Sequence, residues 1–501
     1  MKILFFDTWG TCPQMETSLE IAEKHQAAGD QVQIVNIALH LPFLEWLPDS
    51  GPETRAKMKI RFKKYGDWVR QTGIAFHTDL KCNRAALQTK VPKFENIEAL
   101  KKHKVDDIDI GMAVASSLIS HTCDDQCNLN THRTLLENIY KSALLVMDSF
   151  TAWHAHVKPD LVYIRNARTA TNRPILRICR KHNYRILIHE RAGVLSRYTI
   201  NPNYFHDRQL QLQLMCEHWK KSTLSEAEKE QIGASFFDQR MKGKNDGYVF
   251  IGGQKKELLP EDWDPTKRNI TFFTGSITEF AAIDEENLPD LIFNSQMDAI
   301  AHIADFLSKK PDFRFYVRLH PNTSLSYKQE YERWLHFAEE NKHSIRFIDG
   351  KSPVDTYALV RNSEKVIAHM STVGIEAVYL GKPSIIVGNS YYYRLGANYV
   401  PQNEDELYEL ILNPDLPPKD KKGALIYGYY WQTYGESYRF YKPENIYIGT
   451  YKGIDFHHIE FGDTLNPMIN SEIIKKMMKK EGVLNASKHI SKTLVKKLIK
   501  K

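Results

Sequence analysis

Two short polar segments carry the residue types in this chain that are best suited to chemistry. The first, 318–321 (RLHP), supplies Arg318 and His320 at the end of an apolar run, and the second, 371–377 (STVGIEA), follows another apolar run with a pair of hydroxyls. A guanidinium, an imidazole and hydroxyls beside the unpaired N–H groups of a helix start suit a phosphate group. The two segments therefore predict a site for a phosphorylated ligand rather than an apolar one.

Both segments need the end of a parallel sheet to bring them together, because open α/β sheets bind ligands at the carboxyl ends of their strands. Apolar runs predict five strands in the second half of the chain, over 270–273, 313–319, 344–348, 366–368 and 384–387. Helical patterns alternate with them near 295–309, 328–341, 352–361 and 372–380. This alternation predicts a doubly wound parallel sheet.

The first half of the chain shows the same alternation. Strands are predicted over 2–6, 32–37, 161–164 and 186–188, with helices over 16–28, 134–156 and 174–182. Two such halves predict an α/β protein with two Rossmann-like domains that face each other across a cleft. The first domain is expected at 1–245, with a helical insertion at about 41–130, and the second domain at 246–420. An aromatic-rich segment at 421–470 is expected to pack back across both domains, and a basic amphipathic tail follows at 471–501.

Length and composition agree with a multidomain globular protein. The chain has 501 residues, of which 42% are hydrophobic, and this is too long for a single core. Its six cysteines are scattered and show no paired zinc-site spacing, which favours a reduced, cytoplasmic interior. The apolar run at the N-terminus is too short for a signal peptide, and no stretch has the length of a membrane span.

The net charge of +7 belongs to the tail, where ten lysines stand against two glutamates within 471–501. Apolar residues recur there at helical spacing, from Ile490 to Ile499, with lysines between them. Such a helix can lie on an anionic membrane surface, which predicts a protein peripheral on the inner leaflet of the cytoplasmic membrane. A frayed, solvated terminus is the alternative. Neither interpretation requires nucleic acid.

An ordered set of motifs carries a resemblance to a known family. The motifs are NAR at 166–168, ERAG at 190–193, TGS at 274–276, RLHP at 318–321 and STVGIEA at 371–377. In this order they resemble the capsular polysaccharide biosynthesis glycosyltransferases of the GT-B fold, over about 160–440. The His-Pro and Ser/Thr motifs are also similar to those of bacterial sialyltransferases, Kdo transferases and CDP-glycerol glycerophosphotransferases, which use cytidine-activated donors. Two positions depart from the family pattern: Ala167 stands where glycine is common, and Gly275-Ser276 where Ser-Ser is common.

The resemblance implies that the second domain binds a nucleotide-activated sugar. His320, held by Pro321, is expected to stabilise the charge that builds on the leaving nucleotide. Arg318 either reaches the same phosphate or makes a structural pair. Ser371 and Thr372 are expected to bind the donor phosphate, and helix capping is their structural alternative. Glu376 is expected to bind the ribose, although an acid at a helix start is also favourable for the helix dipole alone. Gly275 and Ser276 are expected to let the backbone approach the donor, and a tight turn is the alternative.

The first domain is expected to bind the acceptor. An inverting transfer needs a base that takes a proton from the acceptor hydroxyl, and Glu190 at a strand end is the predicted base. An ion pair with Arg191 is the structural alternative, and Asp7 is a weaker rival base. Asn166 and Arg168 are expected to bind the acceptor sugar, or else to brace their loop.

No metal or cofactor is expected. Two Asp-x-Asp strings, at 107–109 and 262–264, do not end a strand at the predicted cleft, and the chain has neither a P-loop nor a dinucleotide fingerprint. The sequence therefore predicts a metal-independent glycosyltransferase that uses a nucleotide sugar, CMP-linked by the resemblance, and a glycan or glycolipid acceptor. The alternatives are a UDP-sugar transferase or epimerase of the same fold, and a non-catalytic glycan-binding or assembly scaffold.

Overall fold

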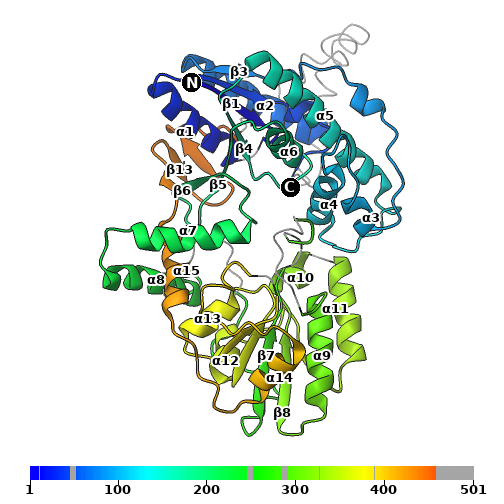
Figure 1. Ribbon diagram of the computed structural model, residues 1–501, viewed down its shortest axis with the longest axis vertical. Helices are drawn as coiled ribbons and strands as arrows, with labels where there is room; N and C mark the ends of the chain where they lie inside the picture. The colour runs from blue at the N-terminus through cyan, green and yellow to red at the C-terminus, as the bar shows by residue number, and fades with distance from the viewer. Residues whose placement is uncertain are drawn as a thin grey trace, which may run out of the picture.

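A computed structural model describes residues 1–458 apart from 11, 46–51, 245–251, 277, 279, 284–291, 327 and 389. The described chain forms two α/β domains stacked along the long axis of the molecule, each built around its own sheet (Figure 1). The basic tail predicted at 471–501 lies outside the described residues. Within the part that is described, no helix is long and apolar enough to cross a membrane.

The sheet of the first domain has the strand order β12-β6-β5-β4-β1-β2-β3. Its strands are β1 (Lys2–Asp7), β2 (Gln31–Asn36), β3 (Ala75–His77), β4 (Leu161–Arg165), β5 (Ile186–Arg191), β6 (Arg197–Asn201) and β12 (Glu436–Ser437). The run from β5 to β3 is parallel, whereas β6 is antiparallel to β5 and β12 is antiparallel to β6. The four predicted strands form the centre of this sheet. The sequence missed β3, β6 and β12, and two of these have only two or three residues in which to show a pattern.

Helices cover both faces of this sheet. They are α1 (Gln14–Ala27), α2 (Pro52–Gln71), α3 (Ile97–Lys101), α4 (Ile110–Thr122), α5 (Arg133–Val157) and α6 (Arg173–Lys181), with 3-10 turns at Ala38–His40 and Ala85–Gln88. Along β1, Ile3 and Phe5 pack with α1 and α2, while Leu4 and Phe6 pack with α4 and α5. Alternate side chains of a strand point to opposite faces, so β1 is buried on both sides. The region 41–130, predicted as a helical insertion, contains α2, α3 and α4, and it also contributes β3 to the edge of the sheet.

The second domain has a five-stranded sheet in the order β11-β10-β7-β8-β9, with every neighbouring pair parallel. Its strands are β7 (Arg268–Phe273), β8 (Phe313–Arg318), β9 (Arg346–Ile348), β10 (Lys365–Ala368) and β11 (Ser384–Ile386). Its helices are α9 (Gln296–Ser308), α10 (Pro321–Ser326), α11 (Lys328–Glu340), α12 (Thr356–Asn362), α13 (Val373–Tyr379) and α14 (Glu404–Leu412). All five predicted strands are present. The predicted fold class, two doubly wound α/β domains of the GT-B type, is confirmed.

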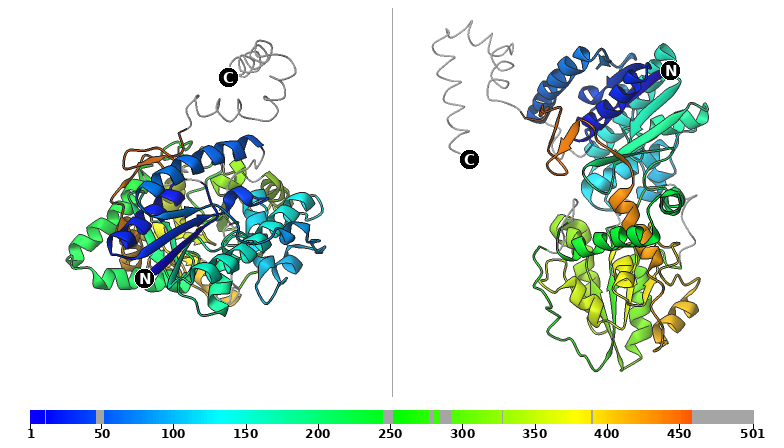
Figure 2. Two further views of the ribbon diagram at one scale, coloured as in Figure 1. Left: turned by 90° about the horizontal axis from the view of Figure 1, so that it is seen from above. Right: turned by 90° about the vertical axis from the view of Figure 1, so that its left-hand side faces the viewer.

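Two connections run between the domains. The first comprises α7 (Arg208–Lys221) and α8 (Glu226–Met241), and the second is the C-terminal return, which we define as 422–458 and which contains α15 (Lys422–Thr433), β12, β13 (Tyr441–Pro443) and β14 (Gly449–Tyr451). The return leaves the second domain along α15 and ends against the first domain (Figure 2). Apolar side chains of α7, α8, α13 and α15 share one cluster, which includes Phe237, Ile375 and Tyr427. The two domains are therefore joined by packed helices as well as by the chain itself.

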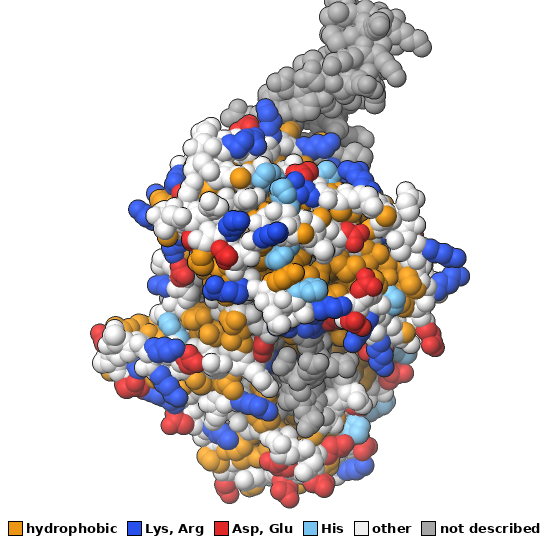
Figure 3. Space-filling view, turned by 45° about the horizontal axis from the view of Figure 1, so that its top comes forward, with side chains coloured by type: hydrophobic (Ala, Val, Ile, Leu, Met, Phe, Trp, Pro, Cys, Tyr) orange, Lys and Arg blue, Asp and Glu red, His pale blue; other side chains and the backbone are white. Residues whose placement is uncertain are grey.

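Charge is evenly mixed on the described surface that Figure 3 presents. Lysine and arginine side chains alternate there with aspartate and glutamate, and no single-sign field covers either domain on that face. A strongly basic patch would be needed to hold a nucleic-acid backbone. The mixed surface agrees with a net positive charge that is concentrated in the tail.

Candidate active site

A cavity of about 520 Å³ lies between the two domains, at the carboxyl-end edge of the second sheet. We call it the interdomain cavity. The first domain lines it with Glu98 and Lys101 of α3 and with Asp125 and Gln126 after α4. The second domain contributes residues before α9, along α11 and at the end of β10, and α7 contributes Arg208. A cavity of this size and position is typical of a small-molecule site.

Arg208 is the most unusual side chain in the interdomain cavity. It begins α7, is only 2% exposed, and lies with its guanidinium 4.7 Å from the centre of the Phe280 ring. Its three guanidinium nitrogens have no hydrogen-bond partner among the described residues. Burial lowers the pKa of Arg208 to about 10, so the group remains a cation at neutral pH. A buried cation without a partner is costly, and an anionic ligand would supply the missing partner.

His369 follows β10 and lines the same cavity. Both of its ring nitrogens lack a hydrogen-bond partner within the described chain. Burial, and then the nearby Arg208 cation, lower the pKa of His369 to about 4, so the ring is neutral at physiological pH. Gly388 packs so closely on the ring that a Cβ atom there would lie 2.4 Å from a ring carbon. His369 is thus held in place with one N–H available to donate.

Arg333 of α11 closes one side of the interdomain cavity. Its Nη1 and Nη2 donate to Asp124 and Asp125 of the first domain over 2.5 and 2.8 Å. Glu330, one turn earlier on α11, is 1% exposed, and burial raises its pKa to about 7. The cavity therefore contains acids as well as cations, and Arg208 is the cation for which the described acids supply no hydrogen bond.

His320 lies at the carboxyl end of β8, as the sequence predicted. Its backbone N–H donates to the Thr274 hydroxyl over 2.8 Å, and its Nδ1 accepts the backbone N–H of Asn322 at 3.2 Å. Pro321 begins α10 immediately afterwards. These bonds fix the ring at the sheet edge, where β7 and β10 also end.

Arg318 bonds backbone carbonyls, where its structural alternative predicted a pair with an acid. It is 3% exposed and donates to the backbone carbonyls of Asp349 and Ser352 over 2.6 and 3.1 Å. Burial lowers the pKa of Arg318 to about 10. Because both carbonyls belong to the loop after β9, the Arg318 side chain braces that loop.

The hydroxyls of Ser371 and Thr372, which were expected to bind an anion, each accept a hydrogen bond from the chain itself. The Thr372 hydroxyl accepts from Arg240 over 3.1 Å, and the Ser371 hydroxyl accepts the backbone N–H of Val373 at 3.4 Å. Glu376 is 3% exposed and accepts from Arg240 Nε over 2.9 Å. In this structure the carboxylate expected to bind ribose is therefore paired with arginine.

Gly275 permits a close approach by a neighbouring loop. Its backbone N–H donates to the Gln296 side chain and its carbonyl accepts from the same side chain, both over 3.1 Å. A Cβ atom at this position would lie 2.9 Å from the Cβ of Met370. The Ser276 hydroxyl lies 3.4 Å from the hydroxyl of Thr278. Gly275 thus lets the Met370 backbone approach closely, and Gln296 and Met370 both line the interdomain cavity.

Glu190 of β5 makes an ion pair, but with a different residue from the one expected. Its carboxylate accepts from Arg165 over 3.1 Å and from Asn166 over 2.9 Å, while Arg191 contributes only its backbone N–H at 3.3 Å. Burial favours protonation of this carboxyl, yet the Arg165 cation and the Asn166 hydrogen bond hold the pKa of Glu190 below its ordinary value. A carboxylate stabilised in this way is a weak base at neutral pH.

The loop after β4 has an unusual backbone. Asn166 and Ala167 both have left-handed φ values, of 61° and 62°. Arg168 is 1% exposed and donates to the hydroxyls of Ser116 and Ser120 over 3.0 and 3.1 Å. Arg168 therefore braces the loop against α4, which is the structural alternative to acceptor binding. Ala167 stands where the family more often has glycine, and glycine adopts this left-handed backbone conformation at a lower energetic cost than alanine.

Asp7 ends β1 at the same edge of the first sheet as Glu190. Its Oδ1 accepts from the Ser18 hydroxyl over 3.0 Å, and its Oδ2 has no partner in the described part of the chain. Burial raises the pKa of Asp7 to about 7, although the Ser18 hydrogen bond and the Arg165 charge oppose the shift. Among the two predicted bases, Asp7 has the pKa that suits proton transfer at neutral pH.

Sequence reasoning missed Arg208, Glu330 and the cavity role of His369. His369 had a local signal, since it directly precedes the STVGIEA segment at the end of a strand. Arg208 and Glu330 had none, because each lies on a helix where a charged residue usually faces solvent. Only tertiary contacts bury them beside the cavity.

A family model described as "Capsule polysaccharide biosynthesis protein" matches residues 283–409. This match supports the resemblance over 283–409, which includes the RLHP and STVGIEA segments, and leaves the NAR, ERAG and TGS motifs outside it. No curated protein matches the chain in sequence.

Solved structures show a distant likeness over much of the chain. The beta Kdo 2,4 transferase of Thermosulfurimonas dismutans KpsC is 15% identical, with 62% of this chain and 88% of that chain covered and a TM-score of 0.36. The beta Kdo 2,7 transferase of the same KpsC is 11% identical, with 56% and 79% covered and a TM-score of 0.33. A UDP-GlcNAc 2-epimerase from Neisseria meningitidis is 13% identical, with 86% and 96% covered and a TM-score of 0.27. These TM-scores are low, so the fold assignment rests on the two sheets themselves.

Proposed function

We propose that this chain, whose residues 283–409 match the capsule polysaccharide biosynthesis family, transfers a sugar from a nucleotide-activated donor to a glycan or glycolipid acceptor. One observation carries the proposal: the interdomain cavity contains Arg208, a buried guanidinium for which the described chain offers no hydrogen-bond partner. A donor phosphate is the ligand that best satisfies such a group, since guanidinium and phosphate form paired, charge-assisted hydrogen bonds.

The phosphate-binding groups also suit the chemistry of the leaving nucleotide. As the glycosidic bond breaks, negative charge grows on the phosphate oxygen that leaves with the nucleotide. Arg208 offers a fixed positive charge and His369 a neutral N–H donor in the same cavity. His320 follows β8, which is separated from β10 by β7, and it lies outside the lining of the cavity at the same edge of the sheet. Preorganised donors of this kind stabilise the transition state more than the ground state. We propose that these groups act without a metal ion at the phosphate.

The acceptor hydroxyl must lose a proton to a base if the anomeric configuration inverts. The sequence predicts Glu190 as the base, but its ion pair with Arg165 at the end of β4 makes it better suited to positioning the loop after β4. Neither acid lines the interdomain cavity, and both lie at the carboxyl-end edge of the first sheet. Asp7 is the stronger candidate because its Oδ2 has no partner among the described residues and burial raises its pKa to about 7. Replacing Asp7 by Asn should lower single-turnover transfer at least a hundredfold and remove an activity rise near pH 7, with nucleotide binding intact.

The variant Glu190→Gln separates the two candidates. If Asp7 is the base, Glu190→Gln retains the pH profile of the wild type and loses less than tenfold in transfer rate. Abolished transfer by Glu190→Gln, together with near-normal turnover by Asp7→Asn, would instead restore Glu190 as the base. Binding of the nucleotide is measured in both variants, because a variant that no longer binds donor says nothing about the base.

The donor is proposed to be cytidine-linked, on the strength of the His-Pro and Ser/Thr motifs. Calorimetric titration with CMP, CDP and UDP tests this assignment. Tighter binding of UDP would favour the alternative, a UDP-sugar transferase or epimerase. Binding of a nucleotide without transfer or epimerisation would favour the non-catalytic scaffold.

Arg208→Gln is the direct test of the observation that carries the proposal. It should weaken nucleotide binding at least tenfold, because the guanidinium is removed and the buried volume is nearly kept. Arg314→Gln, on β8 and bonded only to a neighbouring carbonyl among the contacts described, is the matched control and should bind as the wild type does. Equal binding by the wild type and Arg208→Gln would remove the proposed phosphate site.

We also propose that the basic tail at 471–501 holds the protein on the anionic inner leaflet of the cytoplasmic membrane. The proposal rests on the spacing of apolar and lysine residues in the sequence, since this segment lies outside the described residues. Truncation after Asn470 should abolish sedimentation with phosphatidylserine vesicles in low salt. Undiminished sedimentation of the truncated chain would rule the tail out as the anchor.

A further inference from the structure

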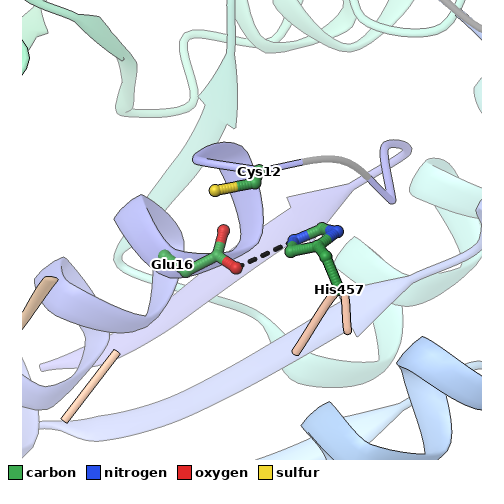
Figure 4. Close-up of side chains that lie close together, drawn as sticks. All are labelled: Cys12, Glu16 and His457. Carbon is green, nitrogen blue, oxygen red and sulfur yellow. Dashed lines mark hydrogen bonds and ion pairs between the residues drawn. The ribbon is translucent and has the colours of Figure 1, made fainter. Parts of the chain in front are cut away.

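Three side chains with metal-binding chemistry meet where the C-terminal return reaches the first domain. Cys12 lies two residues before α1, Glu16 lies in the first turn of α1, and His457 lies near the end of the described return (Figure 4). Their ligand atoms, one sulfur, one carboxylate oxygen and one ring nitrogen, all lie within 4.8 Å of one another. Cys12 and Glu16 are 5% and 1% exposed. These residues are separate from those that line the interdomain cavity.

The donor set has the composition of a zinc site. Thiolate, imidazole and carboxylate bind Zn²⁺ with bonds of about 2.0–2.3 Å in tetrahedral geometry, which places ligand atoms roughly 3.5 Å apart. The Glu16 carboxylate already accepts from His457 Nε2 through its Oε1 at 2.9 Å. Small rotations of the side chains would therefore bring the three ligand atoms around one ion.

A second observation points to a missing ligand at the same place. The other carboxylate oxygen of Glu16, Oε2, is buried and has no hydrogen-bond partner among the described residues. An unpaired buried carboxylate oxygen is costly in a folded protein, and a bound cation would offset that cost. Glu16 therefore has an acceptor directed into the cluster that the described chain leaves unused.

The surroundings provide space and charge for an ion. A cavity of about 360 Å³ is lined by Cys12 and His457 together with Arg61 and Asp455. Burial raises the pKa of the Cys12 thiol, so a bound metal would have to displace its proton. The resulting thiolate, Glu16 and Asp455 would then stand against Arg61, the cation in the described lining of this cavity, which leaves two negative charges. A divalent ion balances this charge. The cavity also leaves room for a water molecule at the fourth coordination position.

We propose that Cys12, Glu16 and His457 bind one Zn²⁺ ion, which fastens the C-terminal return to α1. Glu16 and His457 are 441 positions apart in the sequence, so the ion would close nearly the whole chain into one loop. The return already bonds α1 through Glu20, which accepts the backbone N–H groups of Arg439 and Phe440 over 2.7 and 3.0 Å. The metal extends this attachment to the end of the described return. The proposal does not depend on the proposed sugar transfer.

The test measures metal content and affinity in the full-length protein. After removal of metal with a chelator, Zn²⁺ titration should show one tight equivalent and a rise in the melting temperature. Cys12→Ser and His457→Gln should each weaken Zn²⁺ binding at least tenfold. Cys216→Ser and His336→Gln are the matched controls, since Cys216 lies elsewhere and His336 is an exposed histidine 3.2 Å from Glu340, and both should bind as the wild type does.

Cobalt substitution provides a second readout. Co²⁺ in the wild type should show a near-ultraviolet thiolate-to-metal charge-transfer band, which is absent in Cys12→Ser. If Cys12→Ser does not fold, His457→Gln decides the matter, because His457 is partly exposed and its loss leaves no large void. Absence of a tight equivalent in the wild type, or a tight equivalent that both ligand variants retain, would overturn the proposal.

Discussion

Arg240 on α8 donates a hydrogen bond to the buried carboxylate of Glu376 on α13 over 2.9 Å. The same guanidinium donates to the Thr372 hydroxyl over 3.1 Å. Two residues of the STVGIEA segment therefore hold an arginine that arrives from the connection between the domains. This relationship gives Glu376 a positioning role for Arg240, where the sequence resemblance implied contact with ribose.

Glu376→Gln should destabilise the fold by roughly 2 kcal/mol, since it leaves the Arg240 charge without its ionic partner. The Arg240 side chain is 22% exposed, so water solvates part of its charge and limits the loss. Urea unfolding measures the change, and the double variant Arg240→Gln with Glu376→Gln should recover part of the loss. A Glu376→Gln protein of wild-type stability with tenfold weaker nucleotide binding would support the ribose contact instead.

Asp7 should make the stability of the protein fall as pH rises between about 4 and 7. Burial raises its pKa from 3.8 to about 7, so within this window the folded chain holds a proton that the unfolded chain has released. The stabilisation is complete below the unfolded pKa and is lost as pH rises through the folded pKa. Between pH 4 and pH 8, the free energy of unfolding of Asp7→Asn should therefore rise by roughly 3–4 kcal/mol relative to that of the wild type. A stability difference that does not vary with pH would contradict the shift.

Two buried alanines should respond differently to replacement by glycine. Ala167 and Ala170 are both 0% exposed, but only Ala167 has a left-handed φ, of 62°. Ala170→Gly should cost about 1.5 kcal/mol, from the lost methyl burial and the added chain entropy. Ala167→Gly should be nearly neutral, because relief of about 1–2 kcal/mol of backbone strain offsets the same losses. Thermal unfolding of the two variants tests the difference, and equal costs would show that Ala167 is not strained.

Gly388→Ala should disturb the interdomain cavity by displacing the His369 ring that lines it. The added Cβ atom would lie 2.4 Å from a ring carbon of His369, so the imidazole must move. We expect nucleotide binding to weaken about tenfold, with a stability loss of about 1–3 kcal/mol from overpacking. Gly252→Ala is the control, since a Cβ there meets nothing within 4 Å. Unchanged nucleotide affinity in Gly388→Ala would argue against a role for His369.

Much of the fold could be predicted because central strands and long helices leave local patterns. The four central strands of the first sheet and all five strands of the second coincide with apolar runs, since strands buried on both faces read as continuous apolar sequence. The antiparallel pairing of β6 and β12 could not be predicted in the same way. A two-residue strand such as β12 carries no period, and its partner is more than two hundred positions away.

The candidate site was only partly visible for the same reason. The placement of His320 at the end of β8 follows from an apolar run that ends in a polar group. Whether a polar residue faces the cavity or braces a loop depends on partners from distant segments. Arg318 and Arg168 turned out to brace loops, and Glu190 pairs with Arg165 rather than Arg191.

The sequence by itself determined two α/β domains and the strand ends at which polar groups gather, because both follow from local apolar periodicity. Only the tertiary structure decided which of those groups have partners. It buried Arg208 in the cavity without one, gave Glu376 to Arg240, and brought His457 to Glu16 across the length of the chain. The physical reason is that hydrogen bonding and desolvation are settled by contacts between distant segments, and a local pattern carries no record of them.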